Sequence, residues 1–210
     1  MSVAFQPSLF DAPAPAPGSL TGLSRTPLSR GAWIDVLPGW MTGADQLFAA
    51  LLPGVPWRAE RREMYDRVVD VPRLVHTYGV GEQLPHPALA DARDLLSRHY
   101  LPELGEPFVT AGCCYYRDGR DSVAWHGDRI GRARSHDTMV AIVSLGSPRT
   151  LLLRPRGNVE PTQSLRYSLG HGDLLVMGGS CQRTWEHAVP KTSRPVGPRI
   201  SVQFRPRNVF

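Results

Sequence analysis

Trp125-His126-Gly127-Asp128 is the stretch that decides how the rest of the chain is interpreted. Side chains alternate between the two faces of a β-strand, so His126 and Asp128 are expected to point the same way. A second imidazole, His187, follows later in the sequence Thr184-Trp185-Glu186-His187. Two histidines and one carboxylate on one side of a metal leave other positions open, which is the ligand set of non-haem Fe(II) oxygenases. We predict that these three residues bind a metal.

Two arginines near the C-terminus add to this pattern. Arg199 and Arg205 are six positions apart, and this even spacing places them on one face of the predicted strand 199–205. The open positions of the metal require a bidentate co-substrate and dioxygen, and an acidic co-substrate requires a cation. Arginine suits this task because its guanidinium pairs with a carboxylate in a fork-like geometry.

A second His-Gly-Asp, at residues 171–173, offers an alternative pair of ligands. It follows Leu169-Gly170 and leads directly into the apolar stretch 174–177. Glycine-rich turn chemistry explains this motif without a metal. We therefore expect the ligands to come from the first motif.

Composition limits the class of protein. A chain of 210 residues is most simply one domain with a tail, and it can bury a sizeable core. It contains no run of eighteen apolar residues and no N-terminal basic and apolar leader, so we expect neither a membrane span nor secretion. Three cysteines do not form a disulfide framework. We expect a cytoplasmic, nucleoid-associated monomer.

The net charge of +5 comes almost entirely from arginine, since Lys191 is the only lysine. Genome base composition explains part of this bias. The remaining excess indicates a polyanionic partner, with phosphate groups as the first candidate.

Residues 1–30 are rich in Pro, Ala and Ser. Such a segment cannot bury enough apolar surface to fold, so we predict a disordered tail. Within it, Gln6 to Phe10 resembles the pentapeptide with which bacterial repair and replication proteins bind the sliding clamp. An unremarkable tail explains the same five residues equally well.

The rest of the chain predicts a β-rich α+β domain over residues 31–210. A helix is expected from a Thr42 cap to Leu52, and a second from Pro87 to Tyr100. Residues 58–71 are suited to a hairpin. The sequence then alternates between short apolar segments and Gly- or Pro-rich turns, which is typical of a jelly roll. The expected strands are 107–117, 122–127, 138–145, 150–155, 165–169, 173–177, 182–189 and 199–205.

These motifs, in this order, resemble the AlkB family of Fe(II)- and 2-oxoglutarate-dependent dioxygenases. The likeness runs from about Val71 to Arg205 through Cys114 to Asp121, His126-Gly-Asp128, Leu169 to Gly179, Trp185-Glu-His187 and Arg199-x5-Arg205. It implies a double-stranded β-helix with N-terminal helices and a nucleotide-recognition lid at about residues 55–85. It also implies oxidative dealkylation of N-alkylated bases in DNA or RNA, with release of succinate, CO2 and an aldehyde.

The resemblance implies roles for individual residues. Arg199 and Tyr116 would hold the distal carboxylate of 2-oxoglutarate, and Arg205 would serve the end nearer the metal. Two positions depart from the family pattern. Cys114 stands where an Asn usually donates to the co-substrate, and a thiol is a poorer donor. Ile130 stands where several members carry an acid that reads the base.

Substrate contacts follow from the same resemblance. Met64 and Tyr65 fall where some duplex-acting members carry a finger that fills the gap left by a flipped base, although they could equally pack inward. Arg73 and Arg129 would contact nucleic acid, and Tyr78 would stack on the base opposite His126. Two alternatives remain open. The first is a hydroxylase of a small molecule or protein on the same fold, and the second is a non-catalytic nucleic-acid-binding module.

Overall fold

The computed structural model describes residues 13–64, 67–128, 131–157 and 164–209, with the side chains of residues 61–64, 67–70 and 132 left out. Its elements follow the order β1 (Ala16–Pro17), β2 (Ser24–Pro27), β3 (Ala32–Leu37), β4 (Met41–Thr42), α1 (Ala44–Gly54), β5 (Arg58–Met64), β6 (Arg67–Tyr78), α2 (Pro87–Leu104), β7 (Thr110–Tyr116), β8 (Val123–His126), β9 (Val140–Gly146), β10 (Arg149–Pro155), β11 (Leu165–Leu169), β12 (Asp173–Gly179), α3 (Cys181–Thr184), β13 (Trp185–Val189) and β14 (Arg199–Arg205). Single 3-10 turns lie at Ser29–Gly31 and Arg132–Arg134.

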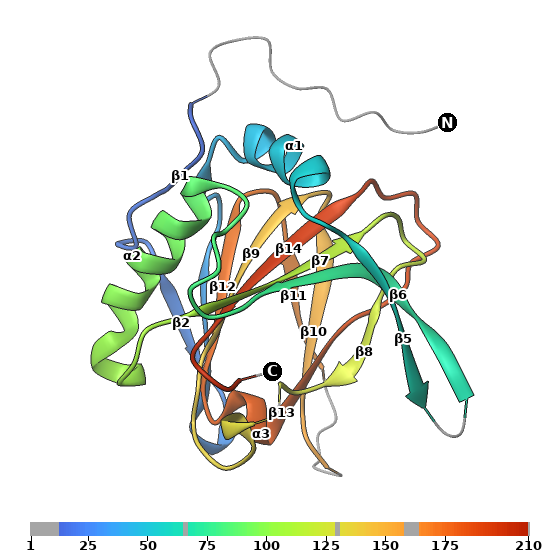
Figure 1. Ribbon diagram of the computed structural model, residues 1–210. Coiled ribbons are helices and arrows are strands. Elements are labelled where there is room, and N and C mark those ends of the chain that lie inside the picture. Colours follow the sequence, from blue (N-terminus) through green and yellow to red (C-terminus); the bar gives the residue numbers. More distant parts are fainter. Residues whose placement is uncertain (1–12, 65–66, 129–130, 158–163, 210) are drawn as a thin grey trace.

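Two sheets carry the fold (Figure 1). The larger has eight strands in the order β2-β3-β12-β9-β14-β7-β6-β5, and the smaller has four in the order β11-β10-β13-β8. Their strands pair antiparallel throughout. The β-rich α+β fold class is confirmed, and the larger sheet is the one that carries both arginine positions of the predicted site.

The larger sheet buries both of its faces, and strand alternation divides its side chains between them. On β9, Val140 and Ile142 pack in the cluster that lies toward the smaller sheet. Val143 and Leu145 pack in the cluster beneath the helices. Figure 1 shows α1 and α2 on that outer side of the sheet. Polar residues on the inner face of the larger sheet therefore point into the space between the two sheets, where the functional site lies.

Both predicted helices form, with shifted ends. The N-cap of α1 is Gly43 in the left-handed conformation (φ 56°) rather than Thr42. The predicted Thr42 cap is wrong because the Thr42 hydroxyl donates to the carbonyl of Ala16 instead. Helix α2 begins at Pro87 as predicted and continues beyond Tyr100 to Leu104, where Gly105 ends it. Among the described residues, no helix has the length and apolarity that a membrane crossing needs.

The predicted boundary of the disordered tail at residue 30 is wrong. The structure describes residues 13–30. Strand β1 pairs with β4 in a separate two-stranded sheet, and β2 pairs with β3 at the edge of the larger sheet. Arg25 on β2 explains part of this order, because it binds the buried carboxylate of Asp35 through both oxygens at 2.8 Å. The clamp-like peptide Gln6 to Phe10 lies outside the described residues and stays a prediction.

The predicted hairpin is present as β5 and β6, which pair with a register shift between Ala59 and Arg61. In Figure 1 it extends beyond the body of the larger sheet and forms its far edge. The expected finger falls at its tip. Tyr65 lies outside the described residues, and the side chain of Met64 is not described.

Gly178 gives a test of the packing of the larger sheet. It pairs across strands with Trp33, whose ring covers it, so a Cβ atom at this position would overlap the indole. We expect Gly178→Ala to lower the free energy of unfolding by about 1–3 kcal/mol through overpacking. Gly54→Ala is the matched control, because a Cβ there meets nothing within 4 Å. Urea denaturation measures both, and equal effects would contradict this packing.

Candidate metal centre and co-substrate pocket

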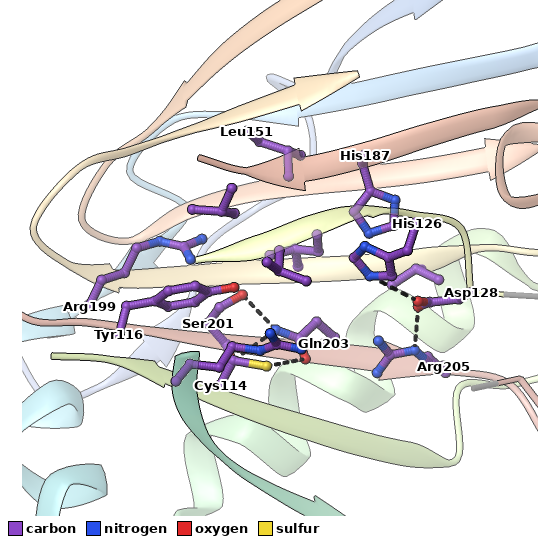
Figure 2. Close-up of a pocket in the computed structure, with 15 residues that line it drawn as sticks. Cys114, Tyr116, His126, Asp128, Leu151, His187, Arg199, Ser201, Gln203 and Arg205 are labelled. Carbon is purple, nitrogen blue, oxygen red and sulfur yellow. Dashed lines mark hydrogen bonds and ion pairs between the residues drawn. The ribbon is translucent and has the colours of Figure 1, made fainter. Parts of the chain in front are cut away.

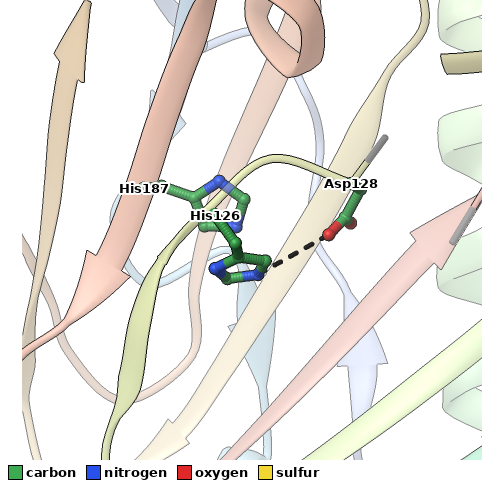
Figure 3. A group of neighbouring side chains, drawn as sticks. All are labelled: His126, Asp128 and His187. Carbon is green, nitrogen blue, oxygen red and sulfur yellow. Dashed lines mark ion pairs between the residues drawn. The ribbon is translucent and has the colours of Figure 1, made fainter. Parts of the chain in front are cut away.

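The three predicted metal ligands come together between the sheets (Figure 3). One ligand atom from each of His126, Asp128 and His187 lies within 4.8 Å of the others. His126 on β8 is the direct cross-strand partner of His187 on β13. Asp128 follows just after β8 and places its Oδ1 atom 3.6 Å from Nε2 of His126. This set fits a divalent metal, with one open side toward the pocket.

Neighbouring groups orient these ligands. The Nδ1 atom of His126 lies 2.9 Å from the carbonyl oxygen of Ala124. A carbonyl only accepts, so Nδ1 carries the proton and Nε2 is left free to bind a metal. The backbone N–H of Asp128 donates to Oε1 of Gln182, which lies on α3, at 2.9 Å. Such contacts orient the ligand side chains even without a bound metal.

The charges around Asp128 keep it ionised. Burial alone would raise the pKa of this carboxyl, but Arg205, His187 and His126 outweigh burial and hold the pKa well below its usual range. Arg205 donates from Nε to Oδ2 of Asp128 at 2.7 Å. Burial, helped by the neighbouring His126, lowers the pKa of His187 to about 3. A carboxylate and a neutral imidazole are the forms that bind metal.

The second His-Gly-Asp motif has a structural role. Nδ1 of His171 accepts from the backbone N–H of Gly146 at 2.7 Å, and its Nε2 lies 2.9 Å from Oδ1 of Asp45 on α1. Gly172 has a φ of 81°, which suits the turn that was expected there. The choice of His126 rather than His171 agrees with this geometry.

A pocket leads from the metal ligands to Arg199 and Tyr116 (Figure 2). Arg199 is only 2% exposed, and its Nε donates to the hydroxyl of Ser144 at 2.9 Å. Its buried Nη1 atom has no hydrogen-bond partner among the described residues. A buried guanidinium with a free donor is costly unless an anion completes it. This orphaned donor fits the distal carboxylate of 2-oxoglutarate.

Tyr116 closes the pocket beside Arg199. The guanidinium carbon of Arg199 lies 5.2 Å from the centre of the Tyr116 ring. Burial raises the pKa of the Tyr116 phenol to about 12, so the hydroxyl stays protonated and can donate to a carboxylate. Arg199 and Tyr116 are cross-strand partners in the pairing of β14 with β7, which fixes their relative position.

Arg149 is a site residue that sequence reasoning missed. It is 4% exposed, and its guanidinium lies 5.6 Å from the centre of the Tyr116 ring. It donates to three backbone carbonyls, those of Asp118, Asp121 and Pro190. Burial lowers the pKa values of both Arg149 and Arg199. Arg199 lines the pocket and Arg149 lies beside Tyr116, so the two add positive charge that favours an acidic co-substrate. No spacing in the sequence signals Arg149.

Cys114 and Arg73 lie where substrate and co-substrate would meet. Both line the Arg199 pocket and a second, larger pocket, called here the open pocket, which is also lined by His126 and Asp128. Arg73 donates from Nη1 to the carbonyl of Ser122 at 3.2 Å, and its buried Nε atom has no partner among the described residues. The predicted placement of both side chains beside the site agrees with the structure.

Tyr78 corrects the prediction that it stacks on a base. It is buried in the cluster beneath the helices and packs edge-on against His76. Arg73, Val75, His76 and Thr77 of β6 line the open pocket, whereas Tyr78 does not line it and is buried beneath the helices. Arg129 lies outside the described residues.

Comparison with known proteins identifies the family. The profile of the 2OG-Fe(II) oxygenase superfamily matches residues 37–205. Alpha-ketoglutarate-dependent dioxygenase alkB homolog 3 of Homo sapiens is 30% identical over an alignment of 210 positions, gaps included, which covers 89% of this chain and 68% of that protein. The chain belongs to the AlkB family. DNA oxidative demethylase ALKBH2 of Arabidopsis thaliana, another member, is 34% identical over 133 residues, or 54% of this chain and 42% of the relative.

Solved structures share the fold of this AlkB-family chain. OsALKBH1 matches with a TM-score of 0.56 at 15% identity, over 82% of this chain and 97% of its own. A 2OG-Fe(II) oxygenase from Burkholderia pseudomallei also matches with a TM-score of 0.56, at 13% identity, over 84% and 86%. Membership of the family makes this protein a dioxygenase that uses Fe(II) and 2-oxoglutarate.

The metal centre gives a second test. We expect His126→Ala to weaken divalent metal binding by on the order of 100-fold, because mutation of a residue that only supports a metal ligand already lowers metal affinity by about 10–100-fold. His171→Ala is the matched control and is expected to bind metal as the unaltered protein does, since His171 contacts Gly146 and Asp45 instead. Calorimetric titration with Mn(II) measures both. Lost binding in the control with retained binding in His126→Ala would reverse the assignment.

Tyr115 and Tyr116 give a matched pair for the co-substrate pocket. Tyr116→Phe removes one hydroxyl donor, and a hydrogen bond to a charged group is worth ~1.5–3 kcal/mol. We therefore expect the KM for 2-oxoglutarate to rise by roughly tenfold or more. Tyr115 is on the opposite face of β7 and packs against Trp57, so Tyr115→Phe is expected to leave this KM unchanged. Equal KM values for the two variants would remove Tyr116 from the pocket.

Proposed function

We propose that this protein removes alkyl groups from N-alkylated bases in DNA by oxidation, with 2-oxoglutarate as co-substrate. The observation that carries the proposal is the joining of two pockets at one metal centre. His126 and Asp128 line both the buried pocket of Arg199 and the open pocket of Arg73. A co-substrate in one pocket and a substrate in the other would therefore both lie next to these two metal ligands.

In this proposal each residue has a defined task. His126, Asp128 and His187 would hold Fe(II), which would supply the oxidising chemistry when bound. Arg199 and Tyr116 bind the distal carboxylate of 2-oxoglutarate. Arg205 keeps Asp128 ionised and in place through the 2.7 Å contact. The buried walls exclude water, so the protein contributes orientation and electrostatics while the metal carries the reaction.

Several features favour a nucleic-acid substrate. The net charge is +5. Arg73 and Arg205 both line the open pocket, and the β5–β6 hairpin forms the neighbouring edge of the sheet. Arginines beside the site can hold phosphates without reading sequence. The alkB homolog 3 and DNA oxidative demethylase relatives support the same substrate class.

Two other functions compete with this one. A hydroxylase of a small molecule or of a protein would use the same metal centre, but it gives the arginine excess no task. A non-catalytic nucleic-acid-binding module would explain the charge, but it leaves the His-Asp-His cluster and the buried Arg199 without a ligand.

Succinate release separates these functions. Purified protein with Fe(II) and 2-oxoglutarate is assayed with single-stranded DNA, duplex DNA and RNA, each in a methylated and an unmethylated form. We expect methylated DNA alone to raise succinate release, with one formaldehyde formed for each methyl group lost. His187→Ala is the inactive control.

Each other result assigns a different function. Release that ignores nucleic acid favours another hydroxylation substrate. Stimulation by methylated RNA but not DNA would move the proposal to RNA. Binding of metal and DNA without any turnover would contradict an enzyme and favour a binding module.

A further inference from the structure

Gln203 lies at the boundary between the two pockets. It follows Ser201 and precedes Arg205 on the inward face of β14, and it lines both the co-substrate pocket and the open pocket. Its side chain is largely buried, since the residue is 8% exposed. Figure 2 shows this amide beside Cys114 and Ser201, on the pocket wall that also holds Arg205.

Hydrogen bonds within the strand fix which way the amide points. Nε2 of Gln203 donates to the backbone carbonyl of Ser201 at 3.0 Å and to its hydroxyl at 2.6 Å. A backbone carbonyl can only accept, so the atom that faces it must be the amide nitrogen. These two bonds use both N–H groups of the amide. The opposite side of the amide presents only an acceptor, Oε1.

This acceptor has spare capacity. Its contact within the described residues is the Cys114 thiol, at 3.8 Å from sulfur to oxygen, and a thiol is a weak donor. Gly112, the cross-strand partner of Gln203, has no side chain to cover Oε1; a Cβ there would lie 3.1 Å from Oε1 and 2.8 Å from Nη1 of Arg205. A carbonyl oxygen has two lone pairs, so Oε1 can accept a stronger bond from a ligand.

The nearby Arg205 does not use this acceptor. Its Nε atom binds Asp128 at 2.7 Å, which keeps this guanidinium directed toward the metal ligands. Arg73 lines the same open pocket and offers donors rather than acceptors. Gln203 thus adds a fixed, neutral hydrogen-bond acceptor to a pocket wall that also holds the donors Arg73 and Arg205 and the carboxylates of Glu60 and Asp128.

We propose that Gln203 determines substrate specificity by accepting a hydrogen bond from an amino group of the substrate base, which rests on the function proposed above. Adenine alkylated at N1 and cytosine alkylated at N3 carry an amino group beside the alkylated nitrogen. Thymine alkylated at N3 carries carbonyl oxygens on both sides instead. A carbonyl placed against Oε1 would set two acceptors face to face and leave both unpaired.

The test compares two oligonucleotides that differ in one base, 3-methylcytosine or 3-methylthymine. The unaltered protein is expected to favour 3-methylcytosine in kcat/KM. Gln203→Met keeps the length of the side chain and removes the acceptor, so the preference should fall by about tenfold, the value of one hydrogen bond. Both substrates are assayed with one protein preparation, so any loss of folded protein cancels from this ratio.

Gln203→Glu is the conservative variant, because it keeps an oxygen acceptor in the pocket, and it is expected to retain the preference. A Gln203→Met variant that loses the same fraction of activity on both bases would show a merely structural role and overturn the inference. If the unaltered protein demethylates neither oligonucleotide, the proposed function is contradicted, and this inference with it.

Discussion

The functional site depends on the alternation of side chains along β14. This strand lies between β7 and β9 in the larger sheet, so its register is fixed on both edges. Ile200, Val202 and Phe204 are fully buried beneath the helices. Packing of these three apolar residues forces the other four, Arg199, Ser201, Gln203 and Arg205, to face the smaller sheet. A slip of one residue would exchange the two sets, so the hydrophobic core itself positions the co-substrate and metal contacts.

Charge gives the site its direction. At one end Arg205 is neutralised by Asp128. At the other end Arg199 and Arg149 are buried near Tyr116, and among the described residues they donate to the Ser144 hydroxyl and to main-chain carbonyls rather than to a carboxylate. Burying cations costs several kcal/mol per ion unless an anion compensates. Main-chain and hydroxyl contacts offset part of this cost, and a bound dicarboxylate would offset more of it. The pocket is therefore preorganised for an anion, and its binding stabilises the folded protein.

Sequence reasoning predicted what periodicity and residue type determine. The strands Leu165–Leu169 and Arg199–Arg205 form with the expected ends, and His126, Asp128 and His187 come together as predicted. It failed where tertiary contacts decide. Arg25 pairs with the buried Asp35, and this contact orders a segment whose composition predicts disorder. Arg149 is oriented by hydrogen bonds to the carbonyls of Asp121 and Pro190, which are distant from it in sequence. Tyr78 was assigned to the wrong face because one strand face cannot be told from the other when both are buried.

We propose that 2-oxoglutarate bridges the metal centre and the buried Arg199. The most direct test is calorimetric binding of 2-oxoglutarate to the protein in the absence of oxygen, with Mn(II) present and with all metal removed. A co-substrate that chelates the metal and also pairs with Arg199 must bind more tightly when the metal is present, because the two sites are linked. We predict an affinity gain of at least about tenfold, within the usual range of such coupling. Equal affinity in both conditions would contradict the account.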